Sequence, residues 1–195
     1  MPRGYDACSR FSGSKKNRLG KYQWIGTQPQ RNKHSMDSKQ LYQEVILDHN
    51  KKPRNWGQLD SPSHKAEGLN PLCGDHIWVM LNVDDQRVEE IAFEGESCAI
   101  CKASASMMTA KVKGKHIDEV EQLVDEFRGM TTGSMNASQS AHLGHLTVFE
   151  GVKDLPSRVK CAILPWHTLH AALQAETTAS TEGDDDPVPG SGNAA

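Results

Sequence analysis

The chain has 195 residues, of which 36% are hydrophobic and 24% charged, and its formal net charge is −3. This length and ordinary composition predict one folded domain with extensions. No apolar run approaches the roughly 20 residues that span a bilayer, and no secretory signal is visible, so we expect neither a membrane protein nor a secreted one. Five cysteines, an odd number, favour free or metal-bound thiols in a reducing compartment, and we therefore expect a cytoplasmic protein.

Charge is distributed unevenly along the chain. Residues 1–35 carry a net charge of +7, residues 176–195 carry −5, and the segment between them carries −5. Both ends are rich in Gly, Ser and Asn, a composition that does not build a packed core. We therefore predict a disordered basic extension over 1–35, a folded domain over 36–175 and a disordered acidic tail over 176–195.

The basic extension allows three interpretations. It could contact nucleic acid or an acidic partner, or it could be a transit peptide, since it is basic, contains serine and is poor in acids. The third interpretation, which we favour, is an upstream extension without a fold. We accordingly expect no nucleic acid and no membrane among the partners of the protein.

The first half of the domain predicts one helix followed by a small antiparallel sheet. Apolar spacing indicates a helix over 38–49, and the Pro, Ser, Gly and Asn content of 60–75 indicates a loop. Alternating apolar residues predict strands over 76–83 and 87–93, joined as an antiparallel hairpin. A further strand or bend follows at 94–97.

The second half of the domain is mainly helical. A helix rich in small residues is expected over 99–113 and a second over 117–127, with a long loop over 129–144. The last helix runs over about 156–175, and Pro165 inside it should kink or split it. The order predicts an α+β fold, with a small antiparallel sheet of about three strands packed on several helices.

Three cysteines and one carboxylate are candidates for a metal site. Cys73 lies in the predicted loop beside Gly74, which permits close backbone approach, and Asp75 follows it by two positions. Cys98 lies at a predicted helix N-terminus, where a thiol has a lowered pKa, and Cys161 lies on the last helix. Three thiolates and one carboxylate can close a four-coordinate site for zinc or iron. The alternative is that these cysteines are small buried hydrophobes.

Cys98 and Cys101 also form a CxxC motif, which at a helix N-terminus can carry out thiol–disulfide exchange. No thioredoxin-like βαβ pattern surrounds the motif, which argues against that role. Cys101 lies one turn inside the helix, so it could replace Cys98 as a ligand or simply pack. Cys8 lies in the basic extension and is expected to be incidental.

Nine histidines include two pairs with metal-binding spacing, His142/His145 and His167/His170. With so many histidines such pairs arise by chance, and we expect them to be solvated or structural. The sequence contains no Gly-rich phosphate loop, nucleophile elbow or paired-carboxylate motif.

In combination, these motifs resemble the iron–sulfur cluster assembly scaffolds of the NifU N-terminal/IscU family. The resemblance covers about residues 36–175. The segments that carry it are Leu41–His49, Pro53–Asn55, Asn70–Asp75, Gly95–Cys98, Ala103–Met108 and Arg158–Ala162. It implies a NifU/IscU-like fold and a metal site made of Cys73, Asp75, Cys98 and Cys161. It further implies that Cys73 accepts sulfur as a persulfide from a PLP-dependent cysteine desulfurase.

Within the family the chain is most similar to the SufU branch. IscU-like members carry His immediately before the last cysteine, where this chain has Lys160, and residues 126–146 look like the insertion typical of SufU-like members. The pair Met107-Met108 also suits that branch. The resemblance implies a SufS-like cysteine desulfurase and recipient apoproteins or other cluster-assembly proteins as partners.

Two roles within the family stay open. One is a scaffold on which an iron–sulfur cluster is built transiently, and the other is a zinc-dependent sulfurtransferase that holds no cluster. Cys73 is the expected nucleophile in either role. A different class of function, a structural zinc-binding interaction module without sulfur transfer, is the alternative.

Overall fold

The structure is a computed structural model that describes residues 15–16, 22–23, 38–136, 138–140 and 142–182. The chain divides into two compact units, Met1–Ser35 and Met36–Ala195. In the first unit two short strands, β1 (Lys15–Lys16) and β2 (Tyr22–Gln23), pair antiparallel. The other residues of the predicted basic extension, Cys8 among them, lie outside the described residues, as does most of the predicted acidic tail.

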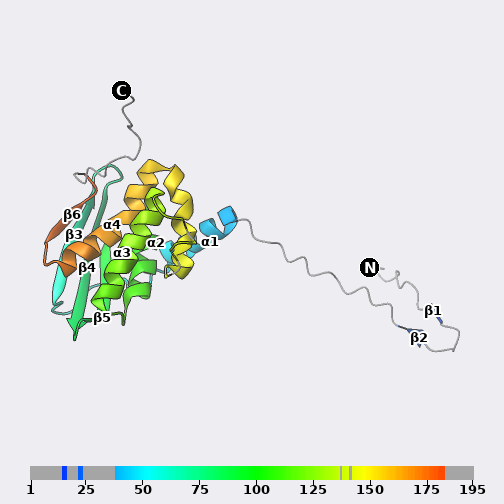
Figure 1. Cartoon of the computed structure of the whole chain (residues 1–195), viewed down its shortest axis with the longest axis horizontal. Coiled ribbons are helices and arrows are strands. Elements are labelled where there is room, and N and C mark those ends of the chain that lie inside the picture. The colour runs from blue at the N-terminus through cyan, green and yellow to red at the C-terminus, as the bar shows by residue number, and fades with distance from the viewer. Residues whose placement is uncertain (1–14, 17–21, 24–37, 137, 141, 183–195) are drawn as a thin grey trace, which may run out of the picture. The chain divides into compact units, whose positions relative to one another are not determined.

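The second unit has helices packed on one side of a sheet, which lies at the left in Figure 1. None of the helices in the described part of the chain is long and apolar enough to cross a membrane. In chain order the elements are α1 (Ser38–Lys51), β3 (His64–Asn70), β4 (Asp75–Asp84), β5 (Arg87–Glu96), α2 (Ala99–Val112), α3 (Ile117–Thr132), the 3₁₀ helix η1 (Gly144–Asp154), α4 (Pro156–Leu173) and β6 (Thr178–Ser180).

The sheet has the strand order β5-β4-β3-β6. The predicted hairpin is confirmed: β4 and β5 pair antiparallel, and the expected strand or bend at 94–97 is the end of β5. Strand β3 pairs antiparallel with β4, and β6 pairs parallel with β3. The α+β class is therefore confirmed, but the sheet is mixed and has four strands rather than about three.

The loop predicted over 60–75 is wrong for its central part, because residues 64–70 form β3. The inward positions of this strand are Ala66, Gly68 and Asn70, all buried. None of them is a large apolar residue, so the strand lacks the usual alternating signal. A Cβ atom at Gly68 would lie 2.0 Å from Oγ1 of Thr168 on α4, and the small side chains therefore serve close helix packing.

The core lies between the sheet and the helices. Of the alternating apolar residues that predict this strand, Ile77, Val79 and Leu81 of β4 are fully buried, whereas Val83 near its end is partly buried. On the helical side Trp166 of α4 stacks on Phe127 of α3, with ring centroids 4.5 Å apart. Aromatic rings and branched aliphatic side chains at this depth supply most of the hydrophobic stabilisation of the domain.

Two helical predictions are wrong in detail. Part of the segment predicted as a loop over 129–144 is helical, because α3 continues to Thr132, and η1 begins at Gly144. Of the two effects predicted for Pro165, a kink or a split, the split is wrong, because α4 continues without interruption from Pro156 to Leu173. Proline removes one backbone hydrogen bond, but the residues around it are buried in the core, and this packing holds the helix together.

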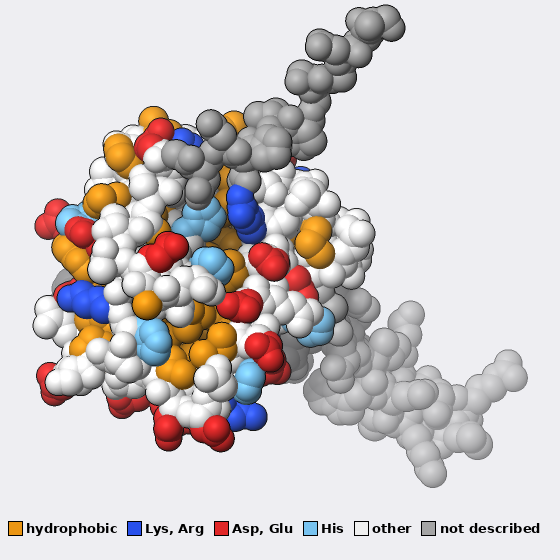
Figure 2. Space-filling model, turned by 60° about the vertical axis from the view of Figure 1, so that its left-hand side comes forward, with side chains coloured by type: hydrophobic (Ala, Val, Ile, Leu, Met, Phe, Trp, Pro, Cys, Tyr) orange, Lys and Arg blue, Asp and Glu red, His pale blue; other side chains and the backbone are white. Residues whose placement is uncertain are grey.

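The exposed surface combines several kinds of side chain. The face of the molecule in Figure 2 shows hydrophobic side chains between histidine and acidic side chains. His167 and His170 line a pocket of about 370 Å³ formed by α3, α4 and β6. His142 lies within hydrogen-bonding distance of the buried Glu126, with His142 Nδ1 2.6 Å from Glu126 Oε1.

Candidate metal centre

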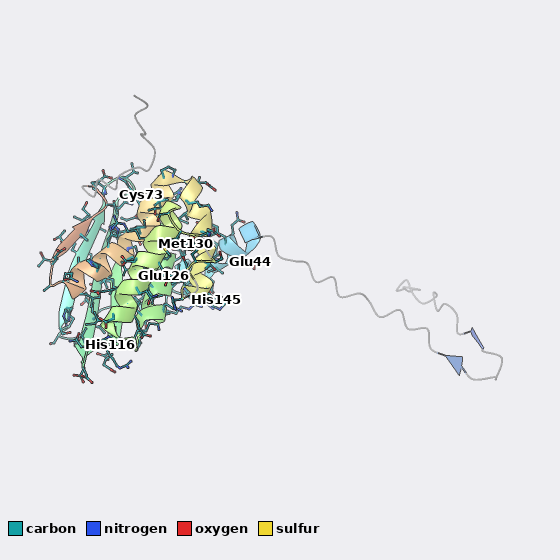
Figure 3. All side chains as sticks on the ribbon, in the orientation of Figure 1. Glu44, Cys73, His116, Glu126, Met130 and His145 are labelled. Atoms are coloured by element: carbon teal, nitrogen blue, oxygen red, sulfur yellow. The ribbon has the colours of Figure 1, made fainter. Side chains whose placement is uncertain are left out.

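The turn between β3 and β4 presents Cys73 at one end of the sheet, as Figure 3 shows, with His116 at the opposite end. The N–H of Cys73 donates to the carbonyl of Asn70 at 3.2 Å, which closes the turn. Gly74 has a φ of +70°, a conformation that side chains other than glycine rarely adopt. A Cβ atom there would meet no protein atom within 4 Å, so it is the backbone conformation of the turn that favours glycine.

Asp75, the first residue of β4, is almost completely buried. Its Oδ1 accepts a hydrogen bond from the backbone N–H of Cys98 at 2.6 Å, and its Oδ2 accepts one from Nδ2 of Asn70 at 3.1 Å. Both donors fix the orientation of the carboxylate. A buried, fixed carboxylate is suited to share a cation with neighbouring thiolates.

Cys161 comes from α4, and its thiol is fully buried. The Sγ atoms of Cys161 and Cys73 lie 3.1 Å apart although the two residues are 88 positions apart in the chain. The ligand atoms of Cys73, Asp75 and Cys161 all lie within 4.8 Å of one another. This is the one such group of His, Cys, Asp or Glu side chains among the residues described in the structure.

Cys98 caps the N-terminus of α2 beside this group. Its Sγ accepts the N–H of Cys101 at 3.5 Å. A hydrogen bond from Cys161 lowers the pKa of Cys98 to about 7, despite burial, and the same hydrogen bond with Cys98 raises the pKa of Cys161 far above its usual range. In the metal-free site one proton is therefore held between two thiols, with Cys98 the more readily ionised.

The donor set fits a thiophilic cation. Two sulfur atoms and one carboxylate oxygen are already grouped, and Cys98 adds a third sulfur from the adjoining helix end. Zinc binds such ligands at about 2.0–2.3 Å in a tetrahedral arrangement, and iron–sulfur clusters are likewise held by thiolates. Ligand atoms this close can reach one ion by rotation of their side chains.

Cys101 is fully buried, and burial raises its pKa well above the usual range. A buried thiol that keeps its proton is a poor nucleophile. The position of Cys101 therefore favours the packing interpretation over thiol–disulfide exchange at Cys98-Ala99-Ile100-Cys101.

Asn70 contributes to the site but is not a candidate ligand in the sequence analysis. Its buried Nδ2 donates to Asp75 and also lies 3.5 Å from Sγ of Cys161, so one amide connects two segments of the site. In the sequence, the only indication of this role is that Asn70 lies three residues before Cys73. Spacing alone does not predict a role for an amide at that distance from a cysteine.

Ser104 of α2 holds the part of α4 that carries Cys161 by two hydrogen bonds. Its Oγ donates to the carbonyl of Ala162 at 2.6 Å and accepts the indole N–H of Trp166 at 3.2 Å. These bonds join α2 to α4 immediately after Cys161. The small residues predicted for α2 therefore include a polar contact that fixes the helix bearing a candidate ligand.

Lys160 has an acidic partner beyond the last helix. Its Nζ lies 2.8 Å from Oε1 of Glu182, which follows β6.

The two histidine pairs with metal-binding spacing form no group of three ligating side chains within the described ranges of the chain.

Comparison with protein families gives one match. Residues 41–175 match the model of the NifU-like N terminal domain. The matched segment contains every residue of the candidate metal centre and ends before β6.

Individual relatives agree with that match. The chain is 41% identical to the zinc-dependent sulfurtransferase SufU of Bacillus subtilis over 136 residues, which cover 70% of this chain and 91% of the relative. It is 40% identical to the iron–sulfur cluster assembly scaffold protein IscU of Streptococcus pyogenes over 139 residues, which cover 71% and 86%. The crystal structure of a nitrogen-fixing NifU-like protein (N-terminal) from Brucella abortus superposes with a TM-score of 0.64 at 27% identity, covering 69% of this chain and 92% of that one.

Proposed function

The chain belongs to the NifU-like N-terminal domain family of SufU/IscU iron–sulfur cluster assembly scaffolds, and on this premise we propose that it takes up sulfur from a cysteine desulfurase at a metal site. The proposed ligands are Cys73, Asp75, Cys98 and Cys161. The resident species is zinc or a transient iron–sulfur cluster.

One observation carries the proposal: ligand atoms from two distant segments of the chain gather within 4.8 Å. Asp75 is buried beside two thiols, where a carboxylate is costly even with its two hydrogen-bond donors, and a shared cation would offset this cost. The additional thiol of Cys98, with its pKa near 7, supplies a further anion at neutral pH.

Cys73 is the proposed sulfur acceptor. It lies on a turn and is partly exposed, whereas Cys161 is fully buried. Zinc, when bound, would keep the thiols deprotonated at neutral pH. The neighbouring Leu72 is 60% exposed, so the turn itself is accessible from the surface.

The proposed transfer step is a thiol–disulfide type exchange. The thiolate of Cys73 attacks the terminal sulfur of a persulfide on the desulfurase cysteine. The S–S bond of that persulfide breaks, a new S–S bond forms on Cys73, and the desulfurase cysteine leaves as a thiolate. The electron count is unchanged, so no external oxidant or reductant takes part.

The basic residues Lys51, Lys52 and Arg54 are a second possible contact for the desulfurase. Arg54 is already paired with Asp48 at 2.7 Å on the exposed surface of α1. This favours a solvated surface over a docking role for Arg54.

Sulfur acceptance is tested with the purified chain, cysteine and a SufS-like desulfurase. We expect mass spectrometry to find a persulfide on the peptide that contains Cys73, and Cys73→Ala to abolish stimulation of the desulfurase. Cys8→Ala, a cysteine outside the proposed site, is the matched control and should leave stimulation intact. Undiminished stimulation by Cys73→Ala would contradict the assignment.

The named relatives support two versions of this role, a zinc-dependent sulfurtransferase and a cluster scaffold. Lys160, at the position before the last cysteine, favours the SufU-like version. Metal analysis after anaerobic purification separates the two. Stoichiometric zinc, with no cluster after reconstitution, would exclude the scaffold version. Zinc binding without any persulfide would instead support the alternative function, a structural zinc-binding module.

A further inference from the structure

The described structure continues beyond the segment that matches the family. The match ends at residue 175, whereas β6 spans Thr178–Ser180 and Glu182 is the last described residue. These residues fall in the acidic tail predicted to be disordered. They are therefore a feature of this chain that the matched family domain does not account for.

The segment 177–182 is attached to the free edge of β3 along its length. The N–H of Glu67 donates to the carbonyl of Thr177 at 2.9 Å, and the N–H of Thr181 donates to the carbonyl of Leu69 at 3.1 Å. Between these bonds β6 and β3 run in parallel register. The side chain of Thr181 is 8% exposed, so the end of the segment is packed into the domain.

The C-terminal end of this attachment lies next to the candidate metal centre. Leu69 directly precedes Asn70, whose amide donates to Asp75 and to Cys161. Glu182 forms an ion pair with Lys160, the residue directly before Cys161. The segment therefore joins the strand that leads into the Cys73 turn to the helix that carries Cys161.

We propose that residues 177–182 act as a clasp that retains the metal ion by holding these two ligand-bearing elements together. Separation of the Cys73 turn from α4 breaks up the ligand set, since the proposed ligands come from both elements. A strand pairing and an ion pair that bridge the two elements oppose that separation. The clasp positions the ligands and is not itself part of the reaction; its role rests on the proposed metal site.

The test uses the full-length chain with two substitutions. Thr181→Pro removes the N–H that binds Leu69, and Glu182→Gln removes the charge that binds Lys160. Glu90→Gln is the matched control, because Glu90 also bonds a neighbouring side chain, that of Asn82, but lies toward the other end of the sheet. Zinc transfer to a chromogenic chelator and hydrogen exchange of the Glu67 amide by NMR are the two readouts.

We expect Thr181→Pro to accelerate zinc release about tenfold, the effect typical of losing a residue that supports metal ligands. Glu182→Gln should accelerate release less, and high salt should remove its difference from the unmodified chain, because exposed ion pairs are screened. In Thr181→Pro the Glu67 amide should exchange at least about tenfold faster, since its acceptor is on the released segment.

Two results would overturn the clasp. In the first, Thr181→Pro releases zinc as slowly as the unmodified chain although its Glu67 amide exchanges fast. The segment would then detach without any effect on the retention of zinc. An unchanged exchange rate in Thr181→Pro would show that the segment is not held as described. If the unmodified chain binds no zinc, the proposed metal site fails instead, and exchange in the metal-free protein still reports on the attachment.

Discussion

The buried amide of Asn70 donates to the carboxylate of Asp75 and to the thiol of Cys161 at the same time. Residues that orient metal ligands in this way are often as important for affinity as the ligands themselves. Asn70 therefore acts as a positioning residue between β4 and α4.

We expect Asn70→Ala to weaken zinc binding about 10- to 100-fold, because the carboxylate of Asp75 loses one of its two fixed donors. Competition with a chelator of known affinity measures the change. Asn82→Ala is the matched control, because it removes an amide bonded to Glu90 near the other end of β4. It should leave the affinity for zinc within about twofold of that of the unmodified chain. Equal affinities for the Asn70→Ala variant and the unmodified chain would contradict the positioning role.

The pKa of about 7 at Cys98 predicts a pH dependence in the metal-free protein. Below pH 7 Cys98 keeps its proton and reacts slowly with iodoacetamide, and above pH 7 the thiolate reacts quickly. Peptide mapping should therefore give an alkylation midpoint near pH 7 for Cys98, against 9.0 for an ordinary thiol. Cys161→Ala removes the main stabilising hydrogen bond and should move the midpoint upward; a midpoint near 9 in the unmodified chain would refute the assignment.

At single positions the sequence predicts the candidate ligands better than their environment. Cys73, Asp75 and Cys161 are identified by their residue types and by the family resemblance, and the structure groups them. Asn70 and Ser104 are not identified as part of the site, because their roles depend on partners 91 and 58 positions away in the chain. For Gly74 the sequence predicts close backbone approach, and the structure adds a second reason for glycine, its left-handed backbone conformation.

Strand β3 and helix α4 pack against each other at a point where there is no room for a side chain. Gly68 provides this closeness, since a Cβ atom there would overlap Oγ1 of Thr168. The contact brings α4, and with it Cys161, against the strand that leads to Cys73.

Gly68→Ala should lower the free energy of unfolding by about 1–3 kcal/mol, the usual cost of overpacking a core. Denaturation by urea measures it. Gly151→Ala is the matched control, because a Cβ atom there would meet nothing within 4 Å and the backbone conformation is not left-handed. A Gly68→Ala variant as stable as the control would show that the two elements separate easily.

Among the elements, those with large alternating side chains were predictable and the others were not. The hairpin of β4 and β5 follows from inward residues such as Ile77 and Phe93. Strand β3 was missed because its inward residues are small, and β6 because three residues give no periodicity. For Pro165 the local rule predicted a break, but burial of the surrounding helix outweighed it.

The domain has one large hydrophobic core, most of which lies away from the candidate metal centre. Buried side chains from strands β3, β4 and β5 and from helices α2, α3 and α4 form one continuous cluster. The candidate ligands lie at one end of it, near the end of the sheet where Cys73 is labelled in Figure 3.

Removal of zinc should therefore leave the fold intact but less stable. We expect chelator-treated protein to keep its far-UV circular dichroism and to melt about 10 °C lower, as expected when a ligand at high excess over its Kd is lost from a domain of this size. A chelated protein that unfolds outright would instead support the structural zinc module, since such domains fold only with metal.

For the whole molecule, the sequence predicted the α+β class and the candidate ligands but not how they meet. Spacings of 25 and 63 residues between the cysteines match no compact metal motif. The candidate ligands approach one another because the turn before β4, the start of α2 and the interior of α4 converge at one end of the sheet, and that convergence depends on the packing of α4. The resemblance to a known family supplied what local patterns could not.

The spread of the ligands along the chain also sets the order of events during synthesis. Cys73 and Asp75 leave the ribosome long before Cys161, and Glu182 emerges later still. A nascent chain thus carries only part of the candidate ligand set until α4 has been synthesised. An ion that needs all of these side chains is consequently held only by a chain whose last helix is complete.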